Sequence, residues 1–276
     1  MRSPAMSKKT TAPDGGGKIL TLTHWLSTFL LVSAFAWTLA ELWIAPDANW
    51  PEALLLVLAA VGAVIALARQ LPLENVLLAA AVMALVGGGA HALNVVTDIP
   101  FGPFTFGPEI GEQIFHTLPW TVPLLWVAAI LNSRGVARLF LRPWRKTRAY
   151  GFWLIGLTAA LTMLLDFALD PFASRVEHYW IWMPTKFPLT WLGAPLVNFF
   201  SWAGVTILIL AFVTPALIKK QLSRRSPPDF HPLAVWLGGI LLFGIASAMR
   251  GLWPAVAADA IIFAVAAAFA IRGALW

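Results

Sequence analysis

The strongest constraint on the fold of this chain is a series of long apolar runs along most of its length. A helix that crosses the hydrocarbon core of a bilayer needs about 20 apolar residues. Eight runs of roughly that kind are bounded by charged residues or by Pro and Gly: Ile19–Ala45, Pro51–Ala68, Leu73–Val96, Leu118–Leu141, Ala149–Leu169, Leu196–Ile218, Pro232–Met249 and Pro254–Ile271. We therefore predict an all-α, polytopic integral membrane helix bundle of about eight transmembrane helices.

The composition agrees with a membrane location, since 59% of the 276 residues are hydrophobic and only 12% are charged. We expect residues 18–276 to form a single transmembrane domain and residues 1–17 to be a disordered N-terminal tail. The first apolar run is longer than the roughly 7–15 residues of a signal-peptide core, so we expect it to be retained as a helix.

The basic residues indicate the orientation of the bundle, because Lys and Arg collect in cytoplasmic loops. Most of the 19 Lys and Arg residues fall on one side of the predicted helices, and the largest group runs from Arg134 to Arg148. We therefore expect a multi-pass protein of the cytoplasmic (inner) membrane with both termini in the cytoplasm. The formal charge of +6 then reflects topology and anionic lipids, and we expect no nucleic-acid partner.

Two carboxylates, Asp166 and Asp170, lie four residues apart at the end of the fifth run and therefore share one helix face. Ionisable groups within a membrane are costly and usually functional. The two acids can share a proton, so one of them can act as a general acid. The alternative is structural: Asp170 only caps the helix end before Pro171, and Asp166 forms a salt bridge with Arg175 or Arg250.

A histidine, His91, shares one stripe of the third run with Asn94 and Asp98, after the small residues Gly87–Gly89. Small residues let another helix or a flat ligand approach closely. If His91 faces the two acids, it can relay a proton or orient water; otherwise it simply hydrogen-bonds to a neighbouring helix. The chain has no Cys and no H-E-x-x-H spacing, so we expect no metal site.

Two segments, 97–119 and 171–195, are rich in Pro, Gly and aromatic residues. They are either loops at the membrane interface or re-entrant segments that line a cavity enclosed by protein. Because an aromatic face stabilises a cation, acids among aromatic rings suit electrophilic chemistry on an alkene. The aromatic candidates for substrate binding are Phe101, Phe104, Phe106, Trp126, Trp180, Trp182, Phe199 and Trp202. No nucleotide-binding motif is present, and we expect no cofactor.

Several short strings in the central part of the chain carry a family resemblance. They are Thr97–Gly102 with Phe104 and Phe106, Pro123–Trp126, Asp166–Pro171, Trp180–Trp182, and Gly193–Phe199 with Trp202. In order and spacing they resemble the membrane carotenoid biosynthesis family of γ-carotene and bisanhydrobacterioruberin hydratases. The resemblance spans roughly Ala90 to Trp202.

This sequence departs from the family pattern at four positions. His91 stands where the family has an acidic residue, and Asp98, Phe104 and Phe106 stand where it has Gly and Tyr. On this comparison Asp98 would be a compensating acid.

The resemblance implies a hydratase, a carbon–oxygen lyase that acts without redox cofactor or metal. Such an enzyme adds water across the terminal C=C of an acyclic carotenoid or similar polyisoprenoid end group and gives a tertiary alcohol. Asp166 or Asp170 would donate the proton, Asn198 would help to hold the water, and Asn94 would contact the substrate, a hydrophobic polyene or isoprenoid lipid.

Two other functions remain open at this point. The protein could be a non-catalytic membrane subunit that binds pigment or lipid within a larger complex. It could also be a proton-coupled transporter that uses Asp166, Asp170, His91 and Asp259 as a relay.

Overall fold

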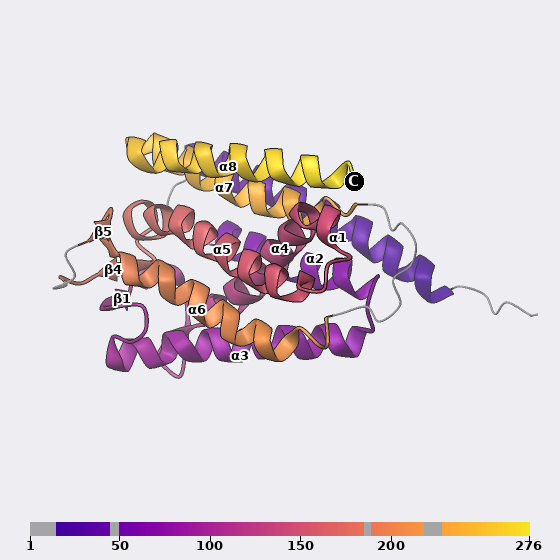
Figure 1. The fold of residues 1–276 in the computed structure, drawn as a ribbon. Helices are drawn as coiled ribbons and strands as arrows, with labels where there is room; N and C mark the ends of the chain where they lie inside the picture. Colours follow the sequence, from indigo (N-terminus) through magenta and orange to yellow (C-terminus); the bar gives the residue numbers. More distant parts are fainter. Residues whose placement is uncertain (1–14, 45–49, 185–188, 218–227) are drawn as a thin grey trace, which may run out of the picture.

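The computed structural model describes residues 15–44, 50–184, 189–217 and 228–276. Within these ranges the chain forms eight long helices: α1 (Gly15–Ile44), α2 (Trp50–Ala68), α3 (Leu73–Thr97), α4 (Thr121–Phe140), α5 (Tyr150–Pro171), α6 (Leu196–Val213), α7 (His231–Met249) and α8 (Trp253–Ala274). They confirm the predicted all-α bundle (Figure 1). Residues 1–14 of the predicted tail lie outside the described residues, and α1 begins at Gly15.

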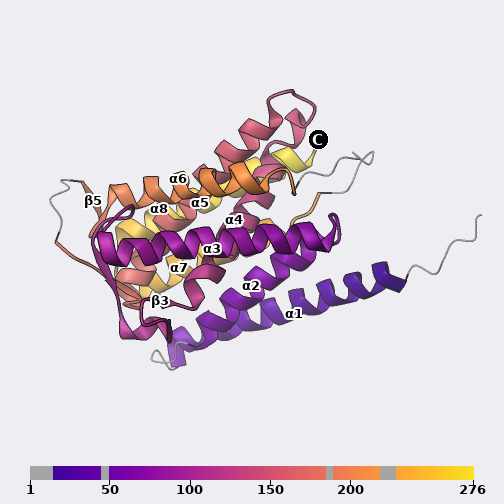
Figure 2. The ribbon, with the colours of Figure 1, turned by 90° about the horizontal axis from the view of Figure 1, so that it is seen from below.

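Seven of the described helices, all except α4, are long and apolar enough to cross a membrane by their length and composition. Together they make this a multi-pass membrane protein. The α1 start and the C-terminus lie at the same end of the bundle in both views (Figures 1 and 2). The side of the membrane that this end faces stays a prediction from the basic residues.

Helix α4 differs from the others because it lies in the centre of the bundle, where it packs against α2, α3, α5, α7 and α8. Most of its side chains are buried, including the polar Asn132, Ser133 and Arg134. Arg134 donates a hydrogen bond of 2.9 Å to the Leu217 carbonyl oxygen. Since α4 contacts protein more than lipid, it can carry polar groups, provided that they find partners. Part of the basic segment predicted from Arg134 to Arg148 therefore belongs to a helix.

The two aromatic segments between helices pair with each other through strands β1 (Phe104–Phe106) and β4 (Trp180–Trp182). The strands are antiparallel, with Phe104 opposite Trp182 and Phe106 opposite Trp180. They lie at the end of the bundle opposite the C-terminus (Figure 1). Trp180 is buried and Trp182 is half-buried, which favours the cavity-lining interpretation of these segments over simple interfacial loops.

Short elements complete the connections. They are η1 (Pro108–Ile110), β2 (Gln113–Ile114), β3 (Leu118–Pro119), η2 (Arg142–Trp144), η3 (Phe172–Val176), β5 (Thr190–Trp191) and β6 (Ala194–Pro195). Strand β2 pairs with β3, and β5 pairs with β6, both antiparallel.

Candidate functional site

A small buried cavity lies where α3, α4, α5 and α6 meet the β1–β4 pair. Its volume is about 10 Å³, which is room for about one water molecule. It is lined by His91, Phe104, Phe106, Val122, Leu125, Asp166, Trp180, Trp182, Asn198 and Trp202. All of these except Val122 and Leu125 are site residues predicted from the sequence, so the fold brings most of the candidates together.

Asp166 is the acid that lines this cavity, and it is 1% exposed. Its Oδ2 accepts a hydrogen bond of 2.7 Å from Asn198 Nδ2. Its Oδ1 is buried with no hydrogen-bond partner among the described residues. The Asn198 amide, and not an arginine, is the hydrogen-bond partner that orients Asp166. Arg175, one of the predicted salt-bridge partners, donates instead to the Leu192 carbonyl oxygen at 2.9 Å. Asn198 thus orients the carboxyl group, and Oδ1 remains available to a ligand or water.

Asp170 has a different environment, because both of its oxygens have partners. Oδ1 accepts from the indole N–H groups of Trp180 at 2.8 Å and Trp182 at 2.9 Å, and Oδ2 accepts from Ser174 Oγ at 3.4 Å. Residues two apart on a strand point to the same face, so one carboxylate holds both indoles. Asp170 therefore anchors β4 to α5, and the helix continues past it to Pro171.

His91 is buried in a cage of aromatic rings. It stacks on Phe101 with ring centroids 4.3 Å apart, and the rings of Phe104 and Trp202 meet it edge-on at 5.9 and 5.8 Å. Neither ring nitrogen has a hydrogen-bond partner among the described residues. Trp126 lies 5.9 Å from His91 and stacks on Trp202 at 4.1 Å. A buried imidazole without a protein partner is a group that can serve a ligand or water.

The chain after α3 folds back to place Phe101 against His91. The Asn94 side chain holds this turn, because its Oδ1 accepts from the Phe101 N–H at 2.7 Å and its Nδ2 donates to the Gly102 carbonyl oxygen at 2.8 Å. Ser201 on α6 donates to the Pro100 carbonyl oxygen at 2.6 Å. Asn94 therefore supports the cage from behind and does not line the cavity.

Gly87 on α3 allows the cage to close from the α4 side. A Cβ added at this position would overlap the indole ring of Trp126. The predicted close approach at Gly87–Gly89 is therefore made by a neighbouring helix, with Trp126 in the space that a side chain would fill.

Other predicted site residues lie outside the cavity wall. Asp98 is exposed and takes the left-handed C-cap position of α3 with φ 59°. Phe199 is buried against Phe167, with ring centroids 5.0 Å apart. Phe101 and Trp126 contact His91 from the layer behind the wall.

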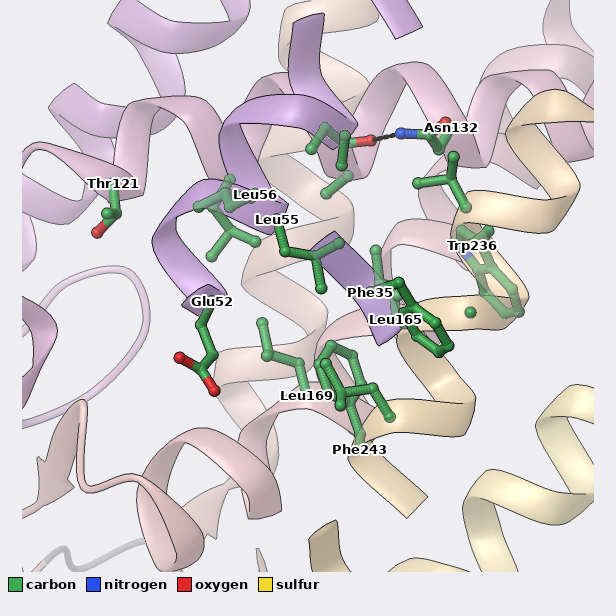
Figure 3. Close-up of a pocket in the computed structure, with 18 of the residues that line it drawn as sticks. Phe35, Glu52, Leu55, Leu56, Thr121, Asn132, Leu165, Leu169, Trp236 and Phe243 are labelled. Atoms are coloured by element: carbon green, nitrogen blue, oxygen red, sulfur yellow. Dashed lines mark hydrogen bonds between the residues drawn. The ribbon is translucent and has the colours of Figure 1, made fainter. Parts of the chain in front are cut away.

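A second, much larger cavity of about 340 Å³ lies beside the first. Its wall comes mainly from α1, α2, α4, α5 and α7 and is mostly apolar (Figure 3). Labelled apolar residues are Phe35, Leu55, Leu56, Leu165, Leu169, Trp236 and Phe243. The two cavities share Val122, Leu125 and Trp180, so they adjoin at these side chains. The volume is in the range of small-molecule sites. Sequence reasoning missed this cavity, because its aliphatic lining resembles any residue that packs between helices.

One end of the large cavity, near the strands, carries polar residues: Glu52, Glu109 and Tyr179. Burial raises the pKa of the Tyr179 phenol, and the carboxylates of Glu52, Glu177 and Glu109 raise it further. Burial also raises the pKa of the Glu177 carboxyl, while Arg250 opposes this change. Tyr179 therefore stays protonated at neutral pH and can donate a hydrogen bond at this end of the cavity.

Comparison with known proteins places these features in a family. Residues 51–266 match the family described as carotenoid biosynthesis protein. The bisanhydrobacterioruberin hydratase of Haloarcula japonica is 27% identical over 172 residues, which cover 60% of this chain and 56% of that protein. The chain thus matches little more than half of that relative's length. No solved structure matches the chain. The family match includes every residue that lines the small cavity, and the chain belongs to the carotenoid biosynthesis protein family.

Proposed function

We propose that this protein is a hydratase that adds water across the terminal C=C of an acyclic carotenoid or similar polyisoprenoid end group. The observation that carries the proposal is Asp166, a buried acid oriented by Asn198 in a cavity with room for about one water molecule. The hydratase name of the Haloarcula relative supports the same reaction.

The reaction begins when the Asp166 carboxylic acid gives its proton to the less substituted carbon of the terminal alkene. The π bond breaks, and a tertiary cation forms at the other carbon. The oxygen of a water molecule bonds to this cation, and the released proton passes to His91. Return of that proton to the Asp166 carboxylate restores the acid. The balance is one alkene and one water consumed, and one tertiary alcohol formed.

The surroundings suit a cationic intermediate. Phe104, Trp182 and Trp202 line the cavity, and aromatic faces attract a cation by about 0.5–2 kcal/mol each, more when water is excluded. Asn198 lines the same cavity, and its amide can orient both the acid and the water. The enclosure limits water to the molecule that reacts.

The large cavity supplies a place for the rest of the substrate. It meets the small cavity at Val122, Leu125 and Trp180, so an extended apolar chain within it can present its end to Asp166 after a small movement of these side chains. The mostly aliphatic wall gives no polar group along most of the path, as a hydrocarbon chain requires.

The test is turnover of an acyclic carotene by the purified protein in detergent, in isotopically labelled water and without oxygen. We expect a product heavier by one labelled water per reacted end, and no such product from Asp166→Asn. A requirement for oxygen would indicate a hydroxylase and refute the proposal.

The large cavity also favours a second candidate, a membrane subunit that binds a carotenoid or lipid without changing it. Its volume of about 340 Å³ suits this role as well. Stable retention of an unaltered polyene with no hydrated product from any acyclic carotene would favour this candidate.

A further inference from the structure

The end of the large cavity away from the strands has polar residues that the proposed reaction does not use. Glu52 and Asn132 lie at opposite ends of the labelled lining (Figure 3). Asn132 on α4 and His231 at the start of α7 both line the cavity. Trp236 Nε1 donates to Ser133 Oγ at 3.1 Å, which places the first turns of α7 beside the part of α4 that carries Asn132.

Both residues have unused hydrogen-bonding atoms. Asn132 is 2% exposed, and its Nδ2 donates to the Ala128 carbonyl oxygen at 2.8 Å. Its Oδ1 and both ring nitrogens of His231 are buried without a partner among the described residues. An unsatisfied buried polar group costs about 1–3 kcal/mol, so two such residues at one end of an apolar cavity indicate a ligand group.

We propose that this end of the cavity binds a hydroxyl group of the isoprenoid substrate, at a distance from the reacting alkene. A hydroxyl suits both kinds of group, because it can donate to an acceptor such as Asn132 Oδ1 and can accept from a donor such as a His231 ring N–H, whereas a carbonyl can only accept. An anionic head group does not fit, because no Lys or Arg is among the described residues that line the cavity.

The position of the hydroxyl follows from the helix geometry. Val122 borders both cavities and Asn132 lies ten residues further along α4, which corresponds to about 15 Å. The substrate is therefore an extended isoprenoid that already carries a hydroxyl about this far from its reacting end. A hydroxylating or hydrating step must then come before this one. The assignment of the reacting end rests on the proposed function, but the hydroxyl site does not.

The experiment compares two acyclic polyenes of equal length, one with a hydroxyl group at this spacing and one without. Binding is measured by quenching of tryptophan fluorescence in the full-length Asp166→Asn protein, so that no turnover occurs. We expect tighter binding of the hydroxylated polyene. Asn132→Leu and His231→Phe should each weaken that binding by about tenfold, since each removes one hydrogen-bond partner, and should leave binding of the other polyene unchanged.

Thr158→Val is the matched control, because Thr158 is a buried polar residue of α5 that lines neither cavity. It should leave the preference for the hydroxylated polyene unchanged. The proposal is overturned if Asn132→Leu and His231→Phe weaken the binding of both polyenes equally. It is also overturned if mass spectrometry shows that a membrane lipid is the only hydroxyl-bearing ligand that the two variants fail to retain. A preserved hydroxyl preference without turnover in the wild-type protein would refute the hydratase and retain this site.

Discussion

The amide nitrogen of Asn198 on α6 lies 2.7 Å from Asp166 Oδ2 on α5. This contact joins two helices and fixes the plane of the carboxyl group, while Asp166 Oδ1 stays without a partner among the described residues. Only one of the two neighbouring acids has such an oxygen, and the two acids are therefore expected to respond differently to substitution.

The Asp166→Asn variant should lose activity while it keeps its fold. The substitution preserves shape but removes the acidic proton, so hydration should slow by about 10²–10⁴-fold. Product formation in membranes checks the rate, and thermal unfolding with pigment retention checks the fold. A near-normal rate would end the general-acid role of Asp166.

Asp170→Leu should instead act on stability. It leaves the indole N–H groups of Trp180 and Trp182 without their acceptor, at a cost of about 1–3 kcal/mol for each. We expect a lower Tm and altered tryptophan fluorescence. Asp166→Asn is the control, because it leaves the hydrogen bonds from Trp180 and Trp182 to Asp170 in place. An unchanged Tm would mean that Asp170 does not anchor β4.

His91→Gln should slow hydration, but by less than Asp166→Asn does. Glutamine keeps hydrogen-bonding atoms that can orient water, but it cannot take up the released proton. The measurement is the rate with a saturating acyclic carotene. A loss as large as that of Asp166→Asn would make His91 the principal proton carrier.

Ala129→Phe should block the large cavity. Ala129 is buried in α4 and lines this space, so the ring can enter the cavity, and polyene binding should fall with little loss of stability. Ala63→Phe is the control, because Ala63 is buried but lines neither cavity. Overpacking there should cost about 1–3 kcal/mol. Unaltered binding in Ala129→Phe would place the substrate elsewhere.

Cysteine labelling should test the predicted topology, since the chain has no cysteine of its own. Lys146→Cys and His116→Cys replace exposed residues between helices. A membrane-impermeant thiol reagent should label the two from opposite sides, with Lys146→Cys on the cytoplasmic side. Labelling of both from one side would contradict the eight-helix topology.

The sequence allowed the helices to be predicted closely because the thickness of the bilayer fixes their length. The predicted Leu73–Val96, for example, is α3 from Leu73 to Thr97. Asp166 and His91 could be identified because polar residues within apolar runs are costly and therefore conspicuous, whereas Asn198 was predicted only from the family resemblance.

The rest of the site could not be predicted for equally physical reasons. Apolar lining residues such as Val122 and Ala129 look the same whether they face a cavity, a helix or lipid. Asp98 shares the helical stripe of His91, but α3 ends one residue earlier, and the left-handed C-cap leaves Asp98 exposed. The pairing of β1 with β4 joins segments about 75 residues apart, which local patterns do not reveal.

The central position of α4 bears on how many times the chain crosses the membrane. An odd number of crossings leaves the two termini on opposite sides of a bilayer, and an even number leaves them on the same side. By hydropathy alone, seven of the described helices qualify as spans, and that odd number would separate the two ends of the bundle's chain, whereas the structure puts the start of α1 and the C-terminus at the same end (Figures 1 and 2). In related sequences, a polar helix that is shielded by its neighbours has to be included among the membrane crossings before any loop is assigned to one side of the membrane.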